Sequence, residues 1–403
     1  MELLLYMSKQ VTYPFSAIVG LDKLKLAILL NAINPKIGGV LIQGPKGSGK
    51  TTIVRGLTDI LPKVEVVENC PFNCNPHDSS NMCDKCSDIY EKGEQFSIKK
   101  RKMVIINLPL GATEDRVVGS LNVEKVIKLG VGALEPGILA EANQNILYVD
   151  EINLLPDHIA DDLLDAAAYG WNVVEREGIS IRHPSRFILI GTMNPEEGYL
   201  RPQLLDRFSL SVSVQNITTV EDRMEIVKRN LAFEAYPEKF IEKFYSSQEE
   251  LRKRIIQAQS ILTNVNMSDI LLEAICKTCL DLKVDGMRPD LIISKAAKTL
   301  AAFENRELII PDDVLLASEL VLAHRTRGGG FLEPATTDEI RKTLNAKIKE
   351  LKYVEKIKTP DGEVNKKKGK VKGRTMTYIS QEAHEKEEEK IKKKESELDS
   401  LDS

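Results

Sequence analysis

The stretch Gly44-Pro45-Lys46-Gly47-Ser48-Gly49-Lys50-Thr51 decides the fold of this chain, because it reads G-x-x-x-x-G-K-T. It follows an apolar run at residues 40–42, and residues 52–61 after it are apolar at helical spacing. Strand, glycine-rich loop and helix are together the setting that a phosphate-binding loop needs. Glycines let backbone amides turn toward phosphates, and the helix N-terminus adds its dipole. We expect Lys50 to reach the β- and γ-phosphates and the Thr51 hydroxyl to bind Mg²⁺.

The composition narrows the classes of protein. The chain has 403 residues, with 56 basic against 60 acidic side chains, and this near balance disfavours a general nucleic-acid binder. No run approaches about 18 apolar residues, and the N-terminus lacks a basic segment before a hydrophobic one. We therefore expect a soluble, cytoplasmic protein without a membrane partner.

The pattern along the chain predicts three parts. Residues 1–217 alternate apolar strands with helices, and residues 218–327 show helical periods, which indicates a second, all-helical domain. Gly328-Gly329-Gly330 is typical of a hinge. Within residues 328–403 we expect a further helix at residues 338–353 and, beyond it, a tail rich in lysine and glutamate that is mobile or loosely helical.

Three features interrupt the first part beyond the glycine-rich loop. Residues 103–108 read as a buried strand, and residues 122–144 as a loop-rich insert with several Gly and Pro residues. Residues 171–187 predict a β-hairpin around Glu177-Gly178. A hairpin at this place would be an addition to a plain nucleotide-binding core.

Residues 62–102 form an insertion after the helix of the loop, and this insertion holds four cysteines in the pattern C-x3-C followed by C-x2-C: Cys70, Cys74, Cys83 and Cys86. Four thiolates at this spacing close a tetrahedral zinc site or hold an iron–sulfur cluster. Because the segment has little apolar content, a metal would supply its missing core. The alternative is a set of free thiols in a mobile loop, with His77 simply exposed.

Two further cysteines, Cys276 and Cys279, lie in a segment at residues 270–280 that has helical apolar spacing throughout. We interpret them as small core residues of a helix. Six cysteines, four of them bunched, fit a reducing compartment better than a disulfide framework.

Two further strands end in polar residues that complete a nucleotide site. Residues 145–149 deliver Asp150 to a strand end, where it can hold Mg²⁺ through water, and Glu151 can polarise the attacking water. Residues 186–193 end at Asn194, which either sits beside the γ-phosphate or forms a strand-end turn. Its place in series with Asp150 and Glu151 favours the site.

Two arginines and one turn lie outside these strands. Arg207 is not needed by its own loop, so it either stabilises γ-phosphate charge in a neighbouring subunit or pairs with Asp206 on the surface. Arg288 precedes a proline at a helix start and could reach back to the phosphates. The apolar turn that ends at Val19 and Gly20 either lines an adenine pocket or is an ordinary helix start.

The order of these motifs resembles the AAA+ ATPases. Seven segments are more specifically similar to the magnesium chelatase I subunit: residues 112–121, 134–140, 148–155, 172–178, 182–187, 194–198 and 200–208. The resemblance covers roughly residues 14–327. It implies an α/β fold, a doubly wound parallel sheet with β-hairpin insertions, followed by a helical lid.

The resemblance implies ATP and Mg²⁺ as cofactors and gives roles to single residues. The nucleotide is bound by Val19, Gly20, Gly44, Pro45, Lys46, Gly47, Ser48, Gly49, Lys50, Thr51, Thr52 and Asp150. Lys50 and Thr51 become the Walker A pair, and Asp150 and Glu151 become the Walker B pair. Asn194 becomes sensor 1, Arg207 the arginine finger and Arg288 sensor 2.

The resemblance also implies partners. It predicts a homo-oligomeric ring, usually hexameric, because each ATP needs an Arg207 from the next subunit. In that family the ring is the motor, and it works with an integrin-domain AAA+ subunit and a large tetrapyrrole-binding subunit that inserts the metal. Cobalt chelatases use very similar motors, so magnesium and cobalt both stay open. The four-cysteine insertion and the charged tail depart from the plant-type pattern.

Two other classes of protein share the core motifs. One is a MoxR-like chaperone ATPase that remodels protein complexes with an integrin-domain partner. The other is a DNA-associated AAA+ protein that resembles helicase loaders. The neutral charge balance and the lack of a DNA-binding module in the sequence disfavour the second.

Overall fold

The computed structural model describes residues 11–121, 134–176, 179–198, 200–351, 355–358 and 364–367. The predicted turn at Glu177-Gly178 and most of the charged tail lie outside the described residues. Among the described residues, no helix is both long and apolar enough to cross a membrane.

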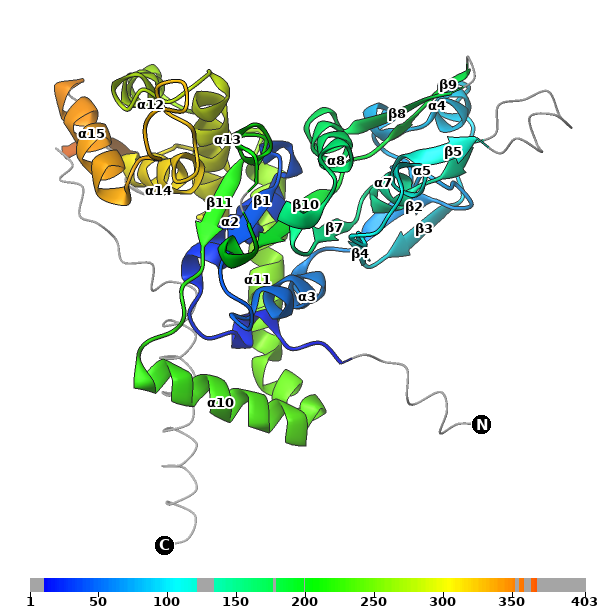
Figure 1. Cartoon of the computed structure of the whole chain (residues 1–403), viewed down its shortest axis with the longest axis horizontal. Helices are drawn as coiled ribbons and strands as arrows, with labels where there is room; N and C mark the ends of the chain where they lie inside the picture. The colour runs from blue at the N-terminus through cyan, green and yellow to red at the C-terminus, as the bar shows by residue number, and fades with distance from the viewer. Residues whose placement is uncertain are drawn as a thin grey trace, which may run out of the picture.

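A sheet of five parallel strands forms the centre of the molecule (Figure 1). Its strand order is β11-β1-β10-β7-β4, so strands that are distant in sequence lie next to one another. The strands are β1 (Val40–Gln43), β4 (Ile105–Asn107), β7 (Ile146–Val149), β10 (Ile188–Met193) and β11 (Leu210–Ser213).

Both faces of this sheet are buried, as expected for a parallel sheet. Side chains alternate along each strand, because successive residues point to opposite faces. On β10, for example, Ile188 and Ile190 belong to one hydrophobic cluster, whereas Leu189 belongs to the other. The strand at the edge differs from the prediction. Residues 105–107 of β4 are half-buried or exposed, because only β7 pairs with this strand.

Helices cover the two faces, which confirms the doubly wound α/β fold. The helices α2 (Asp22–Ile33) and α3 (Lys50–Ile60) pack in the first cluster. The second cluster on the opposite face contains α5 (Glu114–Val118), α7 (Ile138–Ala142) and α8 (Asp157–Tyr169).

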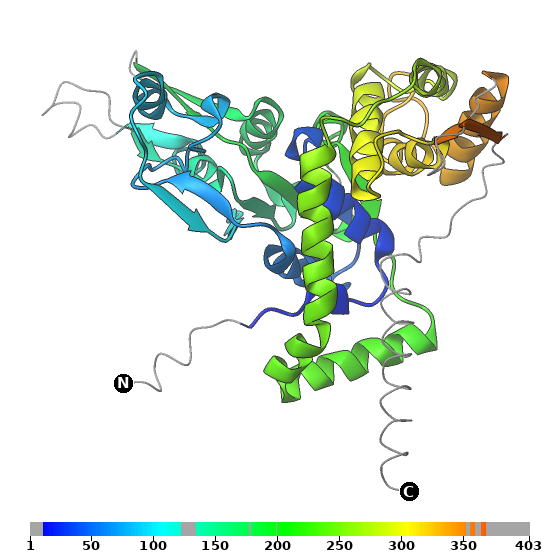
Figure 2. The ribbon, with the colours of Figure 1, turned by 180° about the vertical axis from the view of Figure 1, so that it is seen from behind.

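The chain after the sheet is helical, as predicted. It begins with α10 (Val220–Ala235) and the long helix α11 (Pro237–Ile261), which contacts α2, α3 and α13 and is the long vertical helix of Figure 2. The lid itself consists of α12 (Asp269–Asp281), α13 (Arg288–Phe303), α14 (Pro311–Leu322) and α15 (Thr337–Glu350). Cys279 is buried in the lid core, as predicted, whereas Cys276 on the same helix is only half-buried and lies outside that core.

The further helix predicted at residues 338–353 is present as α15 (Thr337–Glu350), and it packs with the lid although the sequence placed the domain boundary at residue 327. The helix α15 contacts α12 and α14 and buries Ile340, Leu344 and Ile348. Its N-terminus is held by a capping box, in which Thr336 and Glu339 bond each other's backbone amides. Two short strands, β12 (Glu355–Lys358) and β13 (Val364–Lys367), pair antiparallel after it.

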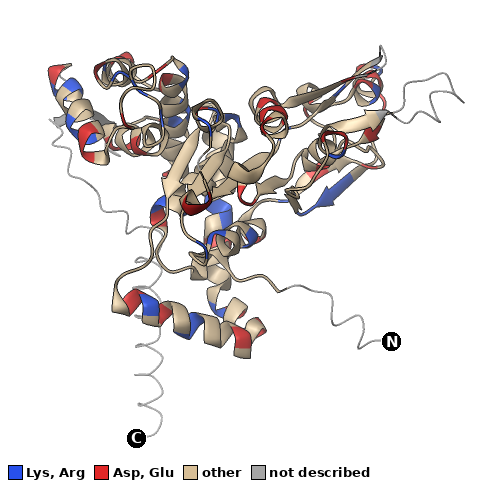
Figure 3. Ribbon diagram, in the orientation of Figure 1, with Lys and Arg blue, Asp and Glu red and all other residues tan. Residues whose placement is uncertain are grey.

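The insertion and two hairpins gather beside the β4 edge of the sheet (Figure 1). In the insertion, β2 (Val64–Val67) pairs antiparallel with β3 (Ile98–Arg101), and α4 (Asp84–Glu91) lies between them in sequence. The strand β3 has a basic stretch that is blue in Figure 3. The predicted hairpin is present as β8 (Trp171–Arg176) and β9 (Ile179–Pro184).

A second hairpin lies where a loop-rich insert was predicted. The strands β5 (Gly119–Leu121) and β6 (Leu134–Pro136) pair antiparallel, with Gly119 opposite Pro136. A glycine is required at position 119, because its φ is +110° and an added Cβ would lie 2.9 Å from the Glu135 carbonyl oxygen. Gly137, one of the glycines that suggested a loop, also permits a close approach, because an added Cβ would lie 2.5 Å from the Gly119 amide nitrogen.

Candidate nucleotide-binding site

The glycine-rich loop runs from the end of β1 to the start of α3. Gly49 is the N-cap of α3 with a left-handed φ of +82°, a conformation that favours glycine. The ammonium of Lys50 folds back over the loop and donates to the carbonyl oxygens of Gly44 and Pro45, at 2.7 Å each. Burial lowers the pKa of Lys50, and the carboxylates of Asp150 and Glu151 oppose that shift.

A cavity of about 380 Å³ opens between this loop and the ends of β7 and β10. It is lined by residues from three separate motifs: Lys46, Gly47, Ser48, Gly49, Lys50, Thr51, Thr52, Asp150, Glu151, Thr192 and Asn194. The first turn of α3 faces the cavity, and the amides of a first helical turn have no partner within the helix. These amides, one lysine and one hydroxyl beside a carboxylate suit a nucleotide polyphosphate with Mg²⁺.

A chain of hydroxyl groups joins the two predicted Mg²⁺-binding residues. The Tyr148 hydroxyl donates to Asp150 Oδ1 at 3.0 Å, and the Thr51 hydroxyl lies 3.3 Å from the Tyr148 oxygen. Thr192 donates to the same Asp150 oxygen at 2.5 Å. Burial, more than its hydrogen bonds, raises the pKa of Tyr148 to about 12, so it stays a donor. Asp150 is thus fixed from two sides.

Glu151 is held at the cavity by its backbone. Its φ is +52°, a left-handed conformation that is uncommon outside glycine and is found at functional turns. Its amide donates to Thr192 Oγ1 at 3.1 Å. The same Thr192 hydroxyl therefore orients both acids of the pair. The Glu151 carboxylate lies 3.4 Å from the Lys46 ammonium.

Lys46 reaches across the mouth of the cavity. Besides Glu151 it pairs with Glu197 at 2.6 Å. Glu197 and then Glu151 raise the pKa of Lys46, and Lys46 in turn lowers that of Glu197. Because the pair is exposed to solvent, it opens without a large cost when a nucleotide enters.

Asn194 forms the predicted strand-end turn, and its role beside the γ-phosphate stays a prediction. It is buried and lines the cavity. Its Oδ1 also accepts the Glu196 amide at 3.3 Å and caps the short helix η6 (Pro195–Glu197). The turn therefore fixes the amide side chain at the strand end.

Comparisons with known proteins agree with this geometry. A family model described as an AAA domain of the dynein-related subfamily matches residues 94–208, and one described as an AAA lid domain matches residues 272–344. A protein of Methanocaldococcus jannaschii described as a magnesium-chelatase subunit ChlI homolog is 56% identical over 333 residues, which is 83% of this chain and 90% of the relative. The magnesium-chelatase subunit ChlI of Cyanophora paradoxa is 51% identical and spans 82% of this chain and 96% of its own length.

The chain belongs to the magnesium-chelatase ChlI family. A solved chain from a complex described as subunits BchI and BchD of magnesium chelatase is also 40% identical, with a TM-score of 0.48, and covers 83% of this chain and 100% of its own length. The relatives from Methanocaldococcus jannaschii and Cyanophora paradoxa favour the ChlI family over the MoxR-like alternative.

In this ChlI-family chain the two predicted arginines do not line the cavity. Arg207 pairs with two acids on α8, Asp165 at 2.7 Å and Asp161 at 3.2 Å. The surface pair of Arg207 with Asp206 that the sequence suggested is therefore wrong, because Asp206 faces the lid. Arg288 lies beside Arg207 and donates to its carbonyl oxygen at 3.1 Å.

The lid holds the segment that carries Arg207. Asp206 accepts a hydrogen bond from the Thr326 hydroxyl at 2.8 Å. The Phe208 carbonyl oxygen accepts from Arg325 at 2.8 Å and lies 2.9 Å from His324 Nε2. His324 is buried, and burial lowers its pKa to about 3, so the ring is neutral and its Nε2 donates. The connection after α9 (Pro202–Leu205) is thus fastened to the lid by neutral and charged donors.

The upstream turn lies next to the glycine-rich loop but outside the cavity lining. Gly20 has a left-handed φ of +64°, and the buried Lys25 ammonium donates to the Ile18 carbonyl oxygen at 2.6 Å. A Cβ at Gly49 would lie 3.9 Å from the Leu21 side chain. Adenine binding by Val19 and Gly20 stays a prediction.

Sequence reasoning missed three residues of the ChlI-family site. Tyr148 and Thr192 were counted only as strand residues, and Glu197 was not singled out. Their strands alternate, and Tyr148 and Thr192 stand two residues before Asp150 and Asn194, which places each pair on one face. That period-two spacing was the available signal. Glu197 has no comparable signal, because its contact with Lys46 crosses between two loops.

Proposed function

We propose that this chain is the ATP-hydrolysing motor subunit of a metal chelatase that acts on a tetrapyrrole. The proposal rests on one observation. Lys50, Asp150, Glu151 and Asn194 line the same cavity in a chain of the ChlI family. These residues come from three strand ends, and their chemistry matches phosphoryl transfer to water.

We infer the following roles during hydrolysis. Amides of the glycine-rich loop and Lys50 bind the β- and γ-phosphates, and Thr51 and Asp150 hold Mg²⁺, which when bound neutralises charge on the phosphates. Glu151 orients and polarises the attacking water, since its carboxylate faces the cavity from a fixed backbone turn. Asn194 helps to position the same water.

We further propose that Arg207 serves the ATP site of a neighbouring copy of this chain in a ring, which we expect to be a hexamer. Arg207 does not line the nucleotide cavity of its own chain. Its guanidinium pairs with two solvent-accessible aspartates, and the phosphates of a nucleotide bound to a neighbouring copy could take their place. Such an arginine stabilises transition-state charge in trans. Arg288, whose side chain contacts the Arg207 backbone, keeps its proposed role as sensor 2, which reaches the phosphates when nucleotide binds.

The partners follow from the family. We propose that the ring works with an integrin-domain AAA+ subunit and with a large tetrapyrrole-binding subunit that inserts the metal. In the solved complex, subunit BchI of magnesium chelatase is paired with a second subunit, BchD. Magnesium and cobalt are both candidates for the inserted metal, because the ATP site in this chain does not touch it.

A complementation assay tests catalysis in trans. Arg207→Ala and Glu151→Gln should each lower ATP turnover by roughly a hundredfold or more. A mixture of the two variants should recover part of the turnover, because some interfaces combine an intact Glu151 with an intact Arg207. Arg201→Ala is the matched control, since Arg201 pairs with Asp157 on α8 and has no proposed role. No recovery in mixed rings would contradict a role of Arg207 in trans.

Reconstitution tests the chelatase role. The purified chain is combined with an integrin-domain AAA+ subunit, a tetrapyrrole-binding large subunit, ATP and either Mg²⁺ or Co²⁺, and metal insertion is followed by absorbance of the porphyrin. We expect ATP-dependent insertion that Glu151→Gln abolishes. Normal ATP turnover with no insertion of either metal would separate the ATPase assignment from the chelatase assignment and overturn only the second.

A further inference from the structure

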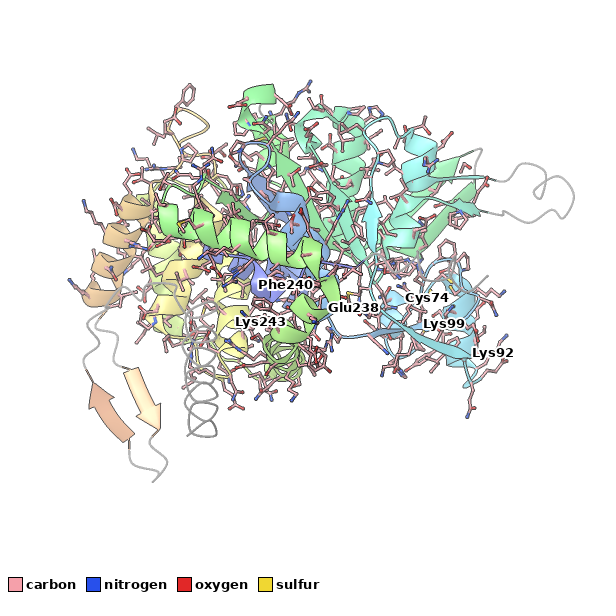
Figure 4. All side chains as sticks on the ribbon, turned by 90° about the horizontal axis from the view of Figure 1, so that it is seen from below. Cys74, Lys92, Lys99, Glu238, Phe240 and Lys243 are labelled. Carbon is pink, nitrogen blue, oxygen red and sulfur yellow. The ribbon has the colours of Figure 1, made fainter. Side chains whose placement is uncertain are left out.

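The four cysteines of the insertion converge on one point. The Sγ atom of Cys70 lies 3.5 Å from that of Cys74, 3.6 Å from that of Cys86 and 4.0 Å from that of Cys83. All four sulfur atoms lie within 4.8 Å of one another. Three of these side chains are buried and Cys70 is half-buried. Figure 4 shows Cys74 in the insertion, at the end of the molecule opposite the lid.

We propose that Cys70, Cys74, Cys83 and Cys86 bind one Zn²⁺ ion in a closed tetrahedral site. Zn–S bonds of about 2.3 Å at tetrahedral angles place the sulfur atoms about 3.8 Å apart, which matches the distances around Cys70. An iron–sulfur cluster has several iron and sulfide ions between its thiolates, so it needs a wider cage. With four protein ligands and no open position, the site is structural rather than catalytic.

The local backbone is shaped to present the sulfur atoms. Asn69 and Asn73, next to the first two cysteines, have left-handed φ values of +61° and +47°. The amide of Cys83 donates to the Cys74 sulfur at 3.1 Å, a contact that stabilises a thiolate and orients it. The second pair begins α4, where Cys83 is the N-cap.

Apolar packing alone does not account for this fold of the loop. The hydrophobic cluster here consists of the four cysteines with four other side chains: Val67, Met82 and the partly buried Phe72 and Phe96. Without a shared ligand, four thiols would occupy the centre of this small core. A metal supplies the missing cohesion, as in other small domains whose folding is coupled to zinc.

The ordered loop is fastened to the ATPase core on one side. Asn143, at the turn before β7, donates to the carbonyl oxygens of Phe72 and Asn73 at 2.8 and 3.1 Å. Gln144 also donates to the Asn73 oxygen, at 2.8 Å. These contacts involve backbone between Cys70 and Cys74. The ion would therefore hold in place the backbone that contacts residues 143–144, the turn before β7, which ends next to Asp150.

A second contact reaches the β8–β9 hairpin. The ring of Phe72 stacks on His183 of β9, with centroids 4.9 Å apart and an interplanar angle of 12°. Arg186 after β9 pairs with Asp78 of the insertion at 3.0 Å. The proposed ion thus braces both the hairpin and the turn before β7, although it lies outside the nucleotide cavity.

Metal analysis of the purified full-length chain tests the proposal. We expect one zinc per chain, measured by elemental analysis and by native mass spectrometry. Cys74→Ser should lower the zinc content at least tenfold, whereas the matched control Cys276→Ser in the lid should keep it. Replacement by Co²⁺ should give visible absorption bands typical of a tetrahedral thiolate site. Iron with acid-labile sulfide, disulfide bonds between these cysteines, or a metal-free chain that does not take up added zinc would overturn it.

Two measurements still test the zinc site if Cys74→Ser fails to fold. The zinc content and the Co²⁺ spectrum of the wild-type chain decide without any variant. Cys86→His, which keeps a zinc ligand, should retain zinc, while Cys86→Ala should lose it. Since no readout here uses ATP, a failure of the chelatase proposal leaves this test unaffected, and the reverse also holds.

Discussion

The nucleotide cavity and the four-cysteine cluster are assembled in opposite ways. The cavity takes residues from position 46 to position 194, and they meet only because β1, β7 and β10 are neighbours in the sheet. The cluster takes its four ligands from positions 70–86, joined by turns and one short helix. The first site therefore depends on the long-range fold, whereas the second organises its own segment.

This difference predicts how each site responds to damage. A change at the cavity should alter chemistry and leave the fold intact, because the sheet positions Asp150 and Glu151 through buried strands. A change at the cluster should release a local segment and leave the sheet intact. Among the described residues, the insertion contacts the core at sites outside the nucleotide cavity, such as the turn at residues 143–144 and the β8–β9 hairpin, so effects of one region on the other should be small.

The largest effect is expected from Glu151→Gln. Loss of the carboxylate removes the group that polarises the attacking water, so ATP turnover should fall about 10²- to 10⁴-fold. Binding of a fluorescent ATP analogue and the thermal midpoint should change little. Glu197→Gln is the matched control, since it removes a carboxylate that contacts the same Lys46. Near-normal turnover in Glu151→Gln would remove Glu151 from the mechanism.

Metal removal should give the next largest effect. With a strong zinc chelator, amide exchange in residues 70–86 should accelerate about a hundredfold, because the local fold loses its ligand. Amides of β1, β7 and β10 should keep their protection, and nucleotide affinity should stay within about threefold. Exchange mass spectrometry resolves both regions in one experiment. Loss of protection across the whole sheet would show that the two regions are not independent.

Thr192→Val should give a smaller change. The substitution keeps the shape and removes the hydroxyl that donates to Asp150 and accepts the Glu151 amide. Two lost hydrogen bonds at about 0.5–1 kcal/mol each cost about 1–2 kcal/mol, or roughly five- to thirtyfold in Mg²⁺-dependent turnover. A Mg²⁺ series of ATPase rates measures it, with Thr58→Val on α3 as the control. Equal rates in both variants would show that Asp150 does not need this donor.

The smallest effect is expected in the pH dependence of stability, through His324 at the contact between the lid and the core. The folded pKa of His324 is lowered to about 3 by burial, below its ordinary value of about 6.5. Between these values the unfolded chain binds a proton there and the folded chain does not. The free energy of unfolding therefore falls as the pH drops below about 6.5, by up to about 1.4 kcal/mol per pH unit.

His324→Gln should remove this part of the pH dependence. The measurement is urea unfolding at several pH values between 5.5 and 7.5, where the variant should show a flatter profile than wild type. His158→Gln, at an exposed position on α8, should keep the wild-type slope. Equal slopes in all three proteins would mean that His324 does not stay neutral in the folded state.

Much of the ATP site could be predicted from sequence because its signals are local. The glycine spacing of the loop and the apolar run that ends in Asp150-Glu151 each predict the local structure from a few adjacent residues. The partners of Arg207 could not be predicted, since Asp161 and Asp165 lie on a helix more than forty positions earlier in the chain. Whether Asp206 turned to Arg207 or to the lid depended on how α14 packs, and no local pattern encodes that.

In the insertion, too, the local feature was predictable from the sequence and the long-range contacts were not. Its cysteine spacing predicted a cluster, and the four sulfur atoms do converge. Its docking on Asn143 and Gln144 was not predictable, because these contacts run from side-chain amides to backbone carbonyl oxygens of any residue type. The β5–β6 hairpin was missed for a related reason, since glycines that permit close strand pairing look like loop residues.

The antiparallel pairing of β2 with β3 has a consequence for how such a protein can change over generations. Val64 lies opposite Arg101, so the segment leaves the core and returns to it at neighbouring points. A whole module can then be gained, exchanged or lost by a single in-frame event, without rethreading the parallel sheet. Loss of the module would leave Asn143, Gln144 and His183 to find new partners, and an engineer could place a sensor or an affinity handle at the same junction.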